Sequence, residues 1–403
     1  MPYDALTIDT SSFMRLGLNL ETGLLAQLSQ FHDGPTALIL SEIVTREILK
    51  HLAENGRKAR DSALAALDRI EQLLLVEGGG LEHAKAAAAA MGDSRAVARQ
   101  RLTTFVETCG AETIPAALCS TDDVLKLYFN SAQPFEASGT KKHEFPDAIA
   151  LLSLEKWAAD NQKTILAISA DKGWAAYAET SDRIDVEADL AKALEIVQEH
   201  AETAESAVAN YLSLIETGKL PDAASDIEHQ LRSSLAAWDY HAEAHSDFYF
   251  EVETWELDLD NYVLLKSDND FNITIVRVGS GVTVARVAAK FTARAKADFS
   301  LSNWDSYDKD YVSLGRSGAS REVVFEGAFL LSLKGDLAED PEEIYVDRAE
   351  VVDAIDEVDF GEIGLDPSFY DDDYADYEAF KAEDAKADLE AEIAANLAHF
   401  GMD

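Results

Sequence analysis

The stretch TALIL, residues 36–40, followed directly by SEIVTREIL, residues 41–49, decides how the first half of this chain is interpreted. The short apolar run is typical of a buried strand, and the pattern after it is typical of an amphipathic helix. Ser41 is a favourable N-cap residue, so the helix is expected to begin at Glu42. A strand followed at once by a helix is the repeating unit of a parallel α/β sheet.

The same alternation of strands and helices extends on both sides of this stretch. ALTI (5–8) and TILAIS (164–169) are apolar runs of strand length, and residues 184–201 are typical of one more strand and a closing helix. Helical patterns lie between these runs. The sequence therefore predicts that residues 1–200 form an α/β domain around a parallel sheet.

The rest of the chain changes character twice. Residues 201–245 are expected to form a helical connector, and residues 246–348 alternate apolar and polar side chains, with Gly279 to Gly281 as a hairpin turn. This predicts an antiparallel β domain, and its aromatic residues are expected to lie mainly in the core. We expect residues 349–403 to be an acidic, partly disordered tail.

Charge is the most unusual feature of the composition. The 403 residues carry a net charge of −42, and residues 336–403, with 24 acidic and 3 basic side chains, contribute half of the excess. Such a surface repels phosphate backbones, so nucleic-acid binding needs a local basic patch or metal ions. A tail of this charge is also expected to occupy a basic groove of the same protein and to hold its activity in check, so truncation after Gly335 should raise activity.

Other classes of protein are disfavoured by what the sequence contains. Two cysteines, Cys109 and Cys119, make neither a disulfide framework nor a zinc cluster. No apolar run has the length of a membrane span, and the first residues lack the pattern of a secretory signal. We therefore expect a cytoplasmic protein without a membrane partner.

Three aspartates are placed where parallel strands end. Asp9 follows ALTI directly, Asp171 follows TILAIS, and Asp147 opens the helical segment DAIALLSLEKWAAD. Each alone has an ordinary explanation as a turn or first-turn residue. At one edge of one sheet, however, the three carboxylates would repel each other unless cations neutralised them. Clustered carboxylates suit hard divalent cations such as Mg²⁺ or Mn²⁺.

The two glutamates of SEIVTREIL are not equivalent. Glu42 is in the first turn, where a negative charge is favourable without any chemistry. Glu47 lies at the margin of the apolar face, where a carboxylate needs a partner. That partner is either a metal ion or a helical neighbour, Lys50 or His51.

At this point the residues resemble a known family, the PIN-domain nucleases. The resemblance rests on the order of four acids: Asp9 in IDTSS, Glu47 in SEIVTRE, Asp147 in FPDAIALLSL and Asp171 in ISADKGW. It covers about residues 3–195. The sequence resembles in particular the larger bacterial PIN-like proteins. In those proteins the third acid follows a Lys-rich loop, here SGTKKHEFPDA, and the C-terminal extension is β-rich. A helical insertion over about 50–130 departs from the minimal domain.

The resemblance implies a Rossmann-like α/β/α sandwich and a hydrolase, an endonuclease that cuts phosphodiester bonds with Mg²⁺ or Mn²⁺, usually in RNA. It implies that Asp9, Glu47, Asp147 and Asp171 are catalytic metal ligands that activate a water for attack on phosphorus. Thr10 and Ser169 are expected to hydrogen-bond to these ligands from a second layer. Lys141 and Lys142 are either substrate-binding residues or solvated loop lysines.

The same residues are compatible with other functions. The same acids would serve a DNA-cutting or structure-selective nuclease, and a non-catalytic PIN-like scaffold would act through the β domain. His241 and His245, in WDYHAEAH, have the spacing of zinc ligands on a helix but no evident third ligand. The sequence names no protein partner and leaves a homo-oligomer open.

Overall fold

The computed structural model describes residues 3–74, 79–90, 92–135, 144–198, 200–279, 281–307, 309–335 and 343–365. The chain divides into two compact units, which are considered separately. The first unit comprises residues 1–227, 265–288 and 328–352, and the second comprises residues 228–264, 289–327 and 353–403. All four predicted acids belong to the first unit.

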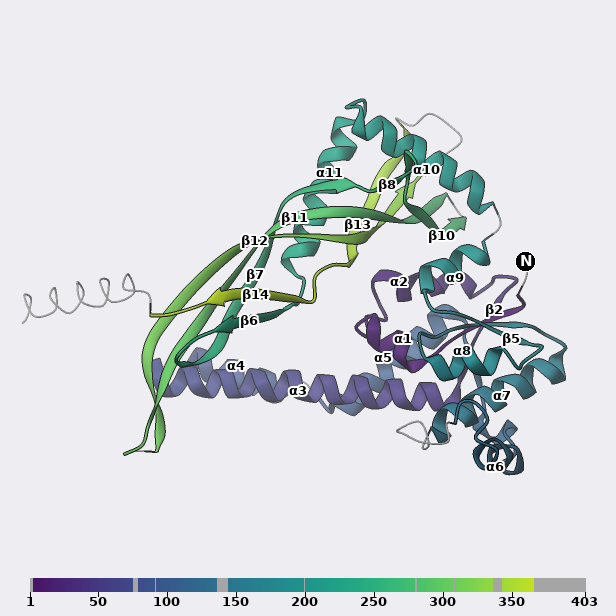
Figure 1. Ribbon diagram of the computed structural model, residues 1–403, viewed down its shortest axis with the longest axis horizontal. Helices are drawn as coiled ribbons and strands as arrows, with labels where there is room; N and C mark the ends of the chain where they lie inside the picture. The colour runs from purple at the N-terminus through teal and green to yellow at the C-terminus, as the bar shows by residue number, and fades with distance from the viewer. Residues whose placement is uncertain are drawn as a thin grey trace, which may run out of the picture. The chain divides into compact units, whose positions relative to one another are not determined.

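A five-stranded parallel sheet forms the centre of the first unit (Figure 1). Its order is β3-β2-β1-β4-β5. The strands are β1 (Ala5–Ile8), β2 (Ala37–Ser41), β3 (Glu112–Ile114), β4 (Ile165–Ile168) and β5 (Ile184–Glu187). β1 pairs with β2 on one side and with β4 on the other. The chain therefore changes direction across the sheet at β1, which makes its carboxyl end the expected position of a ligand site.

Helices within residues 10–196 accompany this sheet and cover both of its faces. They are α1 (Thr10–Arg15), α2 (Gly23–Ala26), η1 (Gln27–Phe31), α3 (Glu42–Leu74), α4 (Gly79–Ala89), α5 (Ser94–Cys109), η2 (Ala116–Leu118), α6 (Thr121–Phe129), α7 (Phe145–Asn161), α8 (Lys172–Ala178) and α9 (Leu190–Ile196). Successive strand residues point to opposite faces. Leu6 and Ile8 pack with α1, α3, α5 and α9, whereas Ala5 packs with α7 and α8. The result is the expected three-layer α/β/α sandwich.

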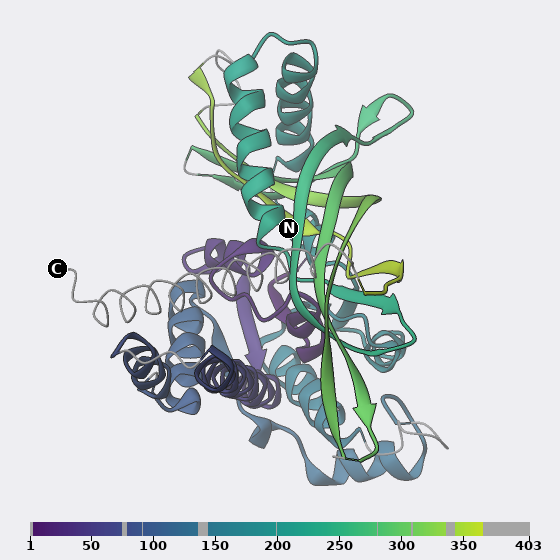
Figure 2. The same cartoon turned by 90° about the vertical axis from the view of Figure 1, so that its left-hand side faces the viewer.

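The helical insertion begins with an unusually long helix. α3 starts directly after β2 and continues for 33 residues, horizontal in Figure 1 and viewed nearly end-on in Figure 2. Its first part packs on the sheet through Val44, Ile48 and Leu52. α5 returns beside it, with Asp93 as its N-cap and Gly110 in the left-handed conformation that ends it. β3, which we did not predict, follows within the insertion.

The remainder of the chain is mainly antiparallel β structure, as expected. Two helices, α10 (Ala201–Glu216) and α11 (Pro221–Ala236), precede it. The strands are β6 (His241–His245), β7 (Tyr249–Leu264), β8 (Lys266–Ser267), β9 (Asp270–Phe271), β10 (Ile273–Gly279), β11 (Val282–Asp305), β12 (Asp310–Lys334), β13 (Tyr345–Asp353) and β14 (Glu357–Glu362). β10 and β11 pair antiparallel around Gly279 and Val282, where a hairpin is predicted.

Two expectations for this region are wrong. Residues 241–245 are not helical: they form β6, which pairs in parallel with β14. Residues 349–362 are not tail, because they supply the end of β13 and all of β14. The rest of the predicted tail, residues 366–403, lies outside the described residues. No helix in the described ranges combines the length and apolar character needed to cross a membrane.

The prediction that aromatic side chains of the β domain lie in the core is only partly confirmed: Phe291 and Phe299 are fully buried, but three others are exposed. Tyr249, Trp255 and Trp304 are 49%, 46% and 51% exposed, so they are not core residues. Tyr311 contacts Tyr249 and Trp304, with ring centroids 4.6 Å and 5.1 Å apart. The alternating pattern places these residues on one face of a strand but cannot show whether that face is covered.

Candidate functional site

The predicted site residues come from strand ends and from helices. Asp9 and Asp171 follow β1 and β4, Glu47 lies in α3, and Asp147 lies in α7. Asp9 follows β1 and is only 5% exposed. The hydroxyl of Ser169, just after β4, donates a hydrogen bond of 3.0 Å to Asp9 Oδ2, and the Ser11 hydroxyl donates to the same oxygen. Burial raises the pKa of Asp9, and these hydrogen bonds oppose that effect.

Glu47 is held by a residue that follows β1. Thr10 Oγ1 donates a 2.6 Å hydrogen bond to Glu47 Oε2 and so joins the start of α1 to α3. Within the described residues, neither Lys50 nor His51 forms an ion pair with this carboxylate. The helical-neighbour interpretation of Glu47 is therefore wrong for this structure.

Glu42 has different partners. Ser41 Oγ accepts a hydrogen bond from the backbone N–H of Ile43, as expected of an N-cap. The Glu42 carboxylate accepts a 2.9 Å bond from the N–H of Ala116 and pairs with Arg46. The Ala116 bond, followed by the charge of Arg46, lowers the pKa of Glu42. Glu42 thus fixes η2 to the start of α3.

Asp147 shows that several carboxylates share this region. It lies in the first turn of α7, and Trp174 Nε1 donates a 3.0 Å hydrogen bond to its Oδ1. Its pKa is raised to about 6, chiefly by burial and further by the charges of Asp9, Glu144 and Glu47. Acids from three separate segments of the chain therefore act on one another electrostatically here.

Asp171 is connected to the other acids less directly. Its carboxylate caps α8 by accepting a hydrogen bond from the N–H of Gly173. The backbone N–H of Asp171 donates a hydrogen bond of 3.1 Å to Ser169 Oγ. Ser169 therefore links Asp171 to Asp9 through one hydroxyl. Asp171 therefore has a structural role as the N-cap of α8, whether or not the residue also binds a ligand.

Glu144 is a site residue that our sequence reasoning missed. It is the N-cap residue of α7, three positions before Asp147, and its charge raises the Asp147 pKa. A Cβ atom on Gly173 would lie 2.8 Å from Asp171 Oδ1 and 3.5 Å from Glu144 Oε2, so these two carboxylates approach the same glycine. The i, i+3 spacing on a predicted helix was the available signal. Lys141 and Lys142 lie outside the described residues.

Comparison with known proteins gives a family for part of the first unit. A family model described as the PIN domain matches residues 6–174. Those residues form a PIN domain. PIN domains are generally nucleases that use divalent metal ions. No curated protein and no solved structure gave a significant match to the chain.

The donor set of the PIN domain fits such a metal ion chemically. Asp9, Glu47 and Asp147 supply only carboxylate oxygens, which Mg²⁺ and Mn²⁺ prefer. Across the described residues, no three His, Cys, Asp or Glu side chains form a ready-made metal cluster. The fit therefore rests on donor chemistry and on the electrostatic coupling of the acids.

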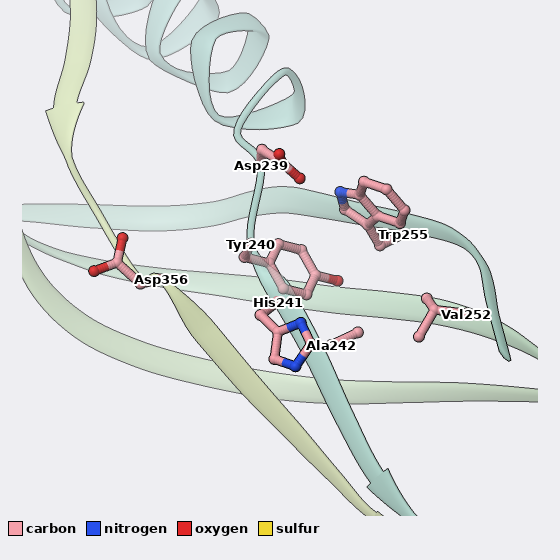
Figure 3. A pocket seen from close by; sticks show the side chains of 7 residues that line it. All are labelled: Asp239, Tyr240, His241, Ala242, Val252, Trp255 and Asp356. Atoms are coloured by element: carbon pink, nitrogen blue, oxygen red, sulfur yellow. The ribbon is translucent and has the colours of Figure 1, made fainter. Parts of the chain in front are cut away.

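A hollow in the second unit contains the histidine that we considered as a zinc ligand (Figure 3). It has a volume of about 420 Å³ and is lined by Asp239, Tyr240, His241, Ala242, Val252, Trp255 and Asp356. His241 and His245 lie at the two ends of β6, so they are about 13 Å apart along an extended strand. The helical spacing required for a zinc pair is therefore absent at these two residues.

Proposed function

We propose that this protein is an endoribonuclease that depends on Mg²⁺ or Mn²⁺. It would cut RNA at the site formed by the acidic residues of its PIN domain. The observation that carries the proposal is the meeting of three acids from separate segments: Ser169 and Thr10 hydrogen-bond to the carboxylates of Asp9 and Glu47. The charges of both carboxylates also raise the pKa of Asp147. Keeping like charges close is unfavourable unless a cation offsets them. The preference for RNA over DNA is proposed because PIN-domain nucleases usually cut RNA.

Each residue is assigned a role. Asp9, Glu47 and Asp147 would hold the metal ion, with Asp171 as a further ligand or as the cap that positions Ser169. A divalent ion held by these carboxylates would supply the positive charge that activates water and stabilises the phosphate. Ser169 and Thr10 orient the carboxylates of Asp9 and Glu47 through the hydrogen bonds described above. Trp174 does the same for Asp147.

The test is a cleavage assay with labelled RNA, single-stranded DNA and duplex DNA, each with Mg²⁺, Mn²⁺ or EDTA. We expect RNA to be cut in either metal and to remain intact in EDTA. Asp9→Asn and Glu47→Gln should lower the cleavage rate by at least about 100-fold, because each removes a ligand charge.

Glu42→Gln is the matched control, since it makes the same chemical change five residues away. It removes the ion pair with Arg46, whereas the amide oxygen of glutamine still accepts from the N–H of Ala116. The cleavage rate should stay within about twofold of the wild type, because exposed ion pairs contribute little. Cleavage that survives both Asp9→Asn and Asp147→Asn would refute the assignment. If DNA is the better substrate, the site stands and the preference for RNA is wrong.

A further inference from the structure

The first unit contains a region whose charge is opposite to that of the chain as a whole. Residues 46–60 of α3 and 94–101 of α5 contain eight Lys or Arg and two Glu, a net charge of +6 in a chain of −42. Three of these arginines are paired with acids: Arg46 with Glu42, Arg60 with Asp61 and Arg101 with Glu21.

Five basic side chains of this region remain unpaired. They are exposed, and among the described residues none of them has an ion-pair partner: Lys50, Arg57, Lys58, Arg95 and Arg99. The whole chain carries 76 acidic residues, so partners for surface cations are plentiful. Isolated surface cations need no special explanation, but five unpaired cations on two adjacent helices repel each other and favour an external anion.

The packing of the two helices brings these side chains together. A Cβ atom on Gly56 of α3 would lie 3.7 Å from Ser94 Cβ at the start of α5. Arg57 and Arg95 are the next residues on the two helices, so they flank this contact. Arg57 lies two turns after Lys50 on the same face of α3, and Arg99 lies one turn after Arg95. We refer to these five residues as the basic face.

The basic face begins beside the candidate site. Glu47 and Lys50 are separated by about one turn of α3, and Arg57 lies about 15 Å from Glu47 along the axis. This length is several times the axial rise of about 3.4 Å per nucleotide in one strand of a duplex, so a few nucleotides span it. A strand cut at the carboxylates has the reach to contact Lys50, Arg57 and Arg95.

We propose that the basic face binds the phosphate backbone of a single-stranded RNA next to the bond that is cut. This inference rests on the proposed function for its substrate, but binding is measured without cleavage. Contacts from Lys and Arg to phosphate do not depend on sequence, so the basic face positions the substrate and does not select its bases. It also supplies the local attraction that an acidic protein otherwise lacks.

The experiment measures the affinity of the full chain for a labelled single-stranded RNA in EDTA at several salt concentrations. The test protein is Arg57→Gln/Arg95→Gln/Arg99→Gln. Each lost phosphate contact should reduce the slope of log affinity against log salt by about 0.7, and the triple variant by about 2. A control with the same change in charge is Lys192→Gln/Lys290→Gln/Lys309→Gln, whose residues are exposed and lie elsewhere.

The outcomes separate this inference from the proposed function. If the two triple variants bind RNA with the same slope, the basic face is refuted even when RNA is cut normally. Suppose that the slope of log affinity against log salt falls only in the first triple variant, and that neither the wild type nor any variant cuts a substrate. The RNA-binding role of the basic face is then supported and the nuclease assignment fails. Arg57→Lys/Arg95→Lys/Arg99→Lys should keep the wild-type slope, and a loss of slope there would contradict a purely electrostatic role. Equal binding of polyglutamate and RNA would also overturn the assignment to nucleic acid.

Discussion

At the scale of single residues, the environment of each acid distinguishes its role better than its position in the sequence does. Glu42 and Glu47 are five residues apart on one helix, yet one binds a backbone N–H of η2 and the other accepts from Thr10 beside Asp9. Helical periodicity predicted this separation. Periodicity could not predict Glu144, because its effect on Asp147 depends on how α7 begins beside Gly173.

Asp147 leads to a prediction about stability. Its pKa of about 6 lies above the value of about 4 for an unfolded chain, so the folded protein binds the proton more tightly between these pH values. Stability from this group is therefore lost as pH rises from 4 to 6, by at most about 3 kcal/mol. Asp147→Asn removes the charge and keeps an oxygen for Trp174. We expect a higher unfolding temperature than wild type at pH 7.5 in EDTA.

The control for this prediction is the same pair of proteins at pH 4, where Asp147 is already protonated. The gain in unfolding temperature should be nearly absent there. An equal gain at both pH values would show that the charge of Asp147 is not the cause. Asp147→Asn should also lose cleavage. A higher unfolding temperature together with lost cleavage would show that Asp147 supports activity at a cost in stability.

At the scale of elements, the predictable part of the fold is the part determined by local pattern. β1, β2 and β4 are continuous apolar runs, and α3, α5 and α7 have helical periodicity with clear first and last residues. β3 has only three residues, and β6 is stabilised as a strand by pairing with β14, about 116 residues later. Such long-range pairing leaves little local signal.

The connection between α8 and the site gives a prediction at this scale. Gly173→Ala would place a Cβ atom 2.8 Å from Asp171 Oδ1 and 3.2 Å from Pro134 Cβ. Asp171 would have to leave its position as the cap of α8, which costs about 1 kcal/mol. We expect a lower unfolding temperature together with slower cleavage, because Asp171 is hydrogen-bonded to Ser169.

Gly80→Ala is the corresponding control. Gly80 is in α4, and no atom lies within 4 Å of the position of its added Cβ. Alanine there should leave the stability unchanged or raise it by less than about 1 kcal/mol, because glycine is unfavourable in a helix and Gly80 lies in its first turn. If Gly173→Ala has the same unfolding temperature and cleavage rate as Gly80→Ala, the contact between Gly173 and Asp171 does not support the site.

At the scale of the whole molecule, the opposite charges of the chain and its basic face determine how a polyanion approaches. The net charge of −42 repels RNA at long range, whereas the basic face attracts it only at short range. Salt screens the long-range repulsion first, since the screening length falls to about 8 Å at physiological ionic strength. The acidic C-terminal residues are the simplest part of this balance to change.

Deletion of residues 366–403 removes 12 acidic and 2 basic side chains, a net charge of −10. The deletion begins after Leu365 and not after Gly335, because β13 and β14 belong to the folded chain. We expect the KM for RNA to fall several-fold at low salt and kcat to stay constant, because the deletion reduces repulsion without altering the carboxylates. The difference in KM should disappear near 1 M salt, where screening acts within about 3 Å. If KM falls equally at all salt concentrations, the tail acts through a specific contact, and if KM does not change, its charge is irrelevant to substrate binding.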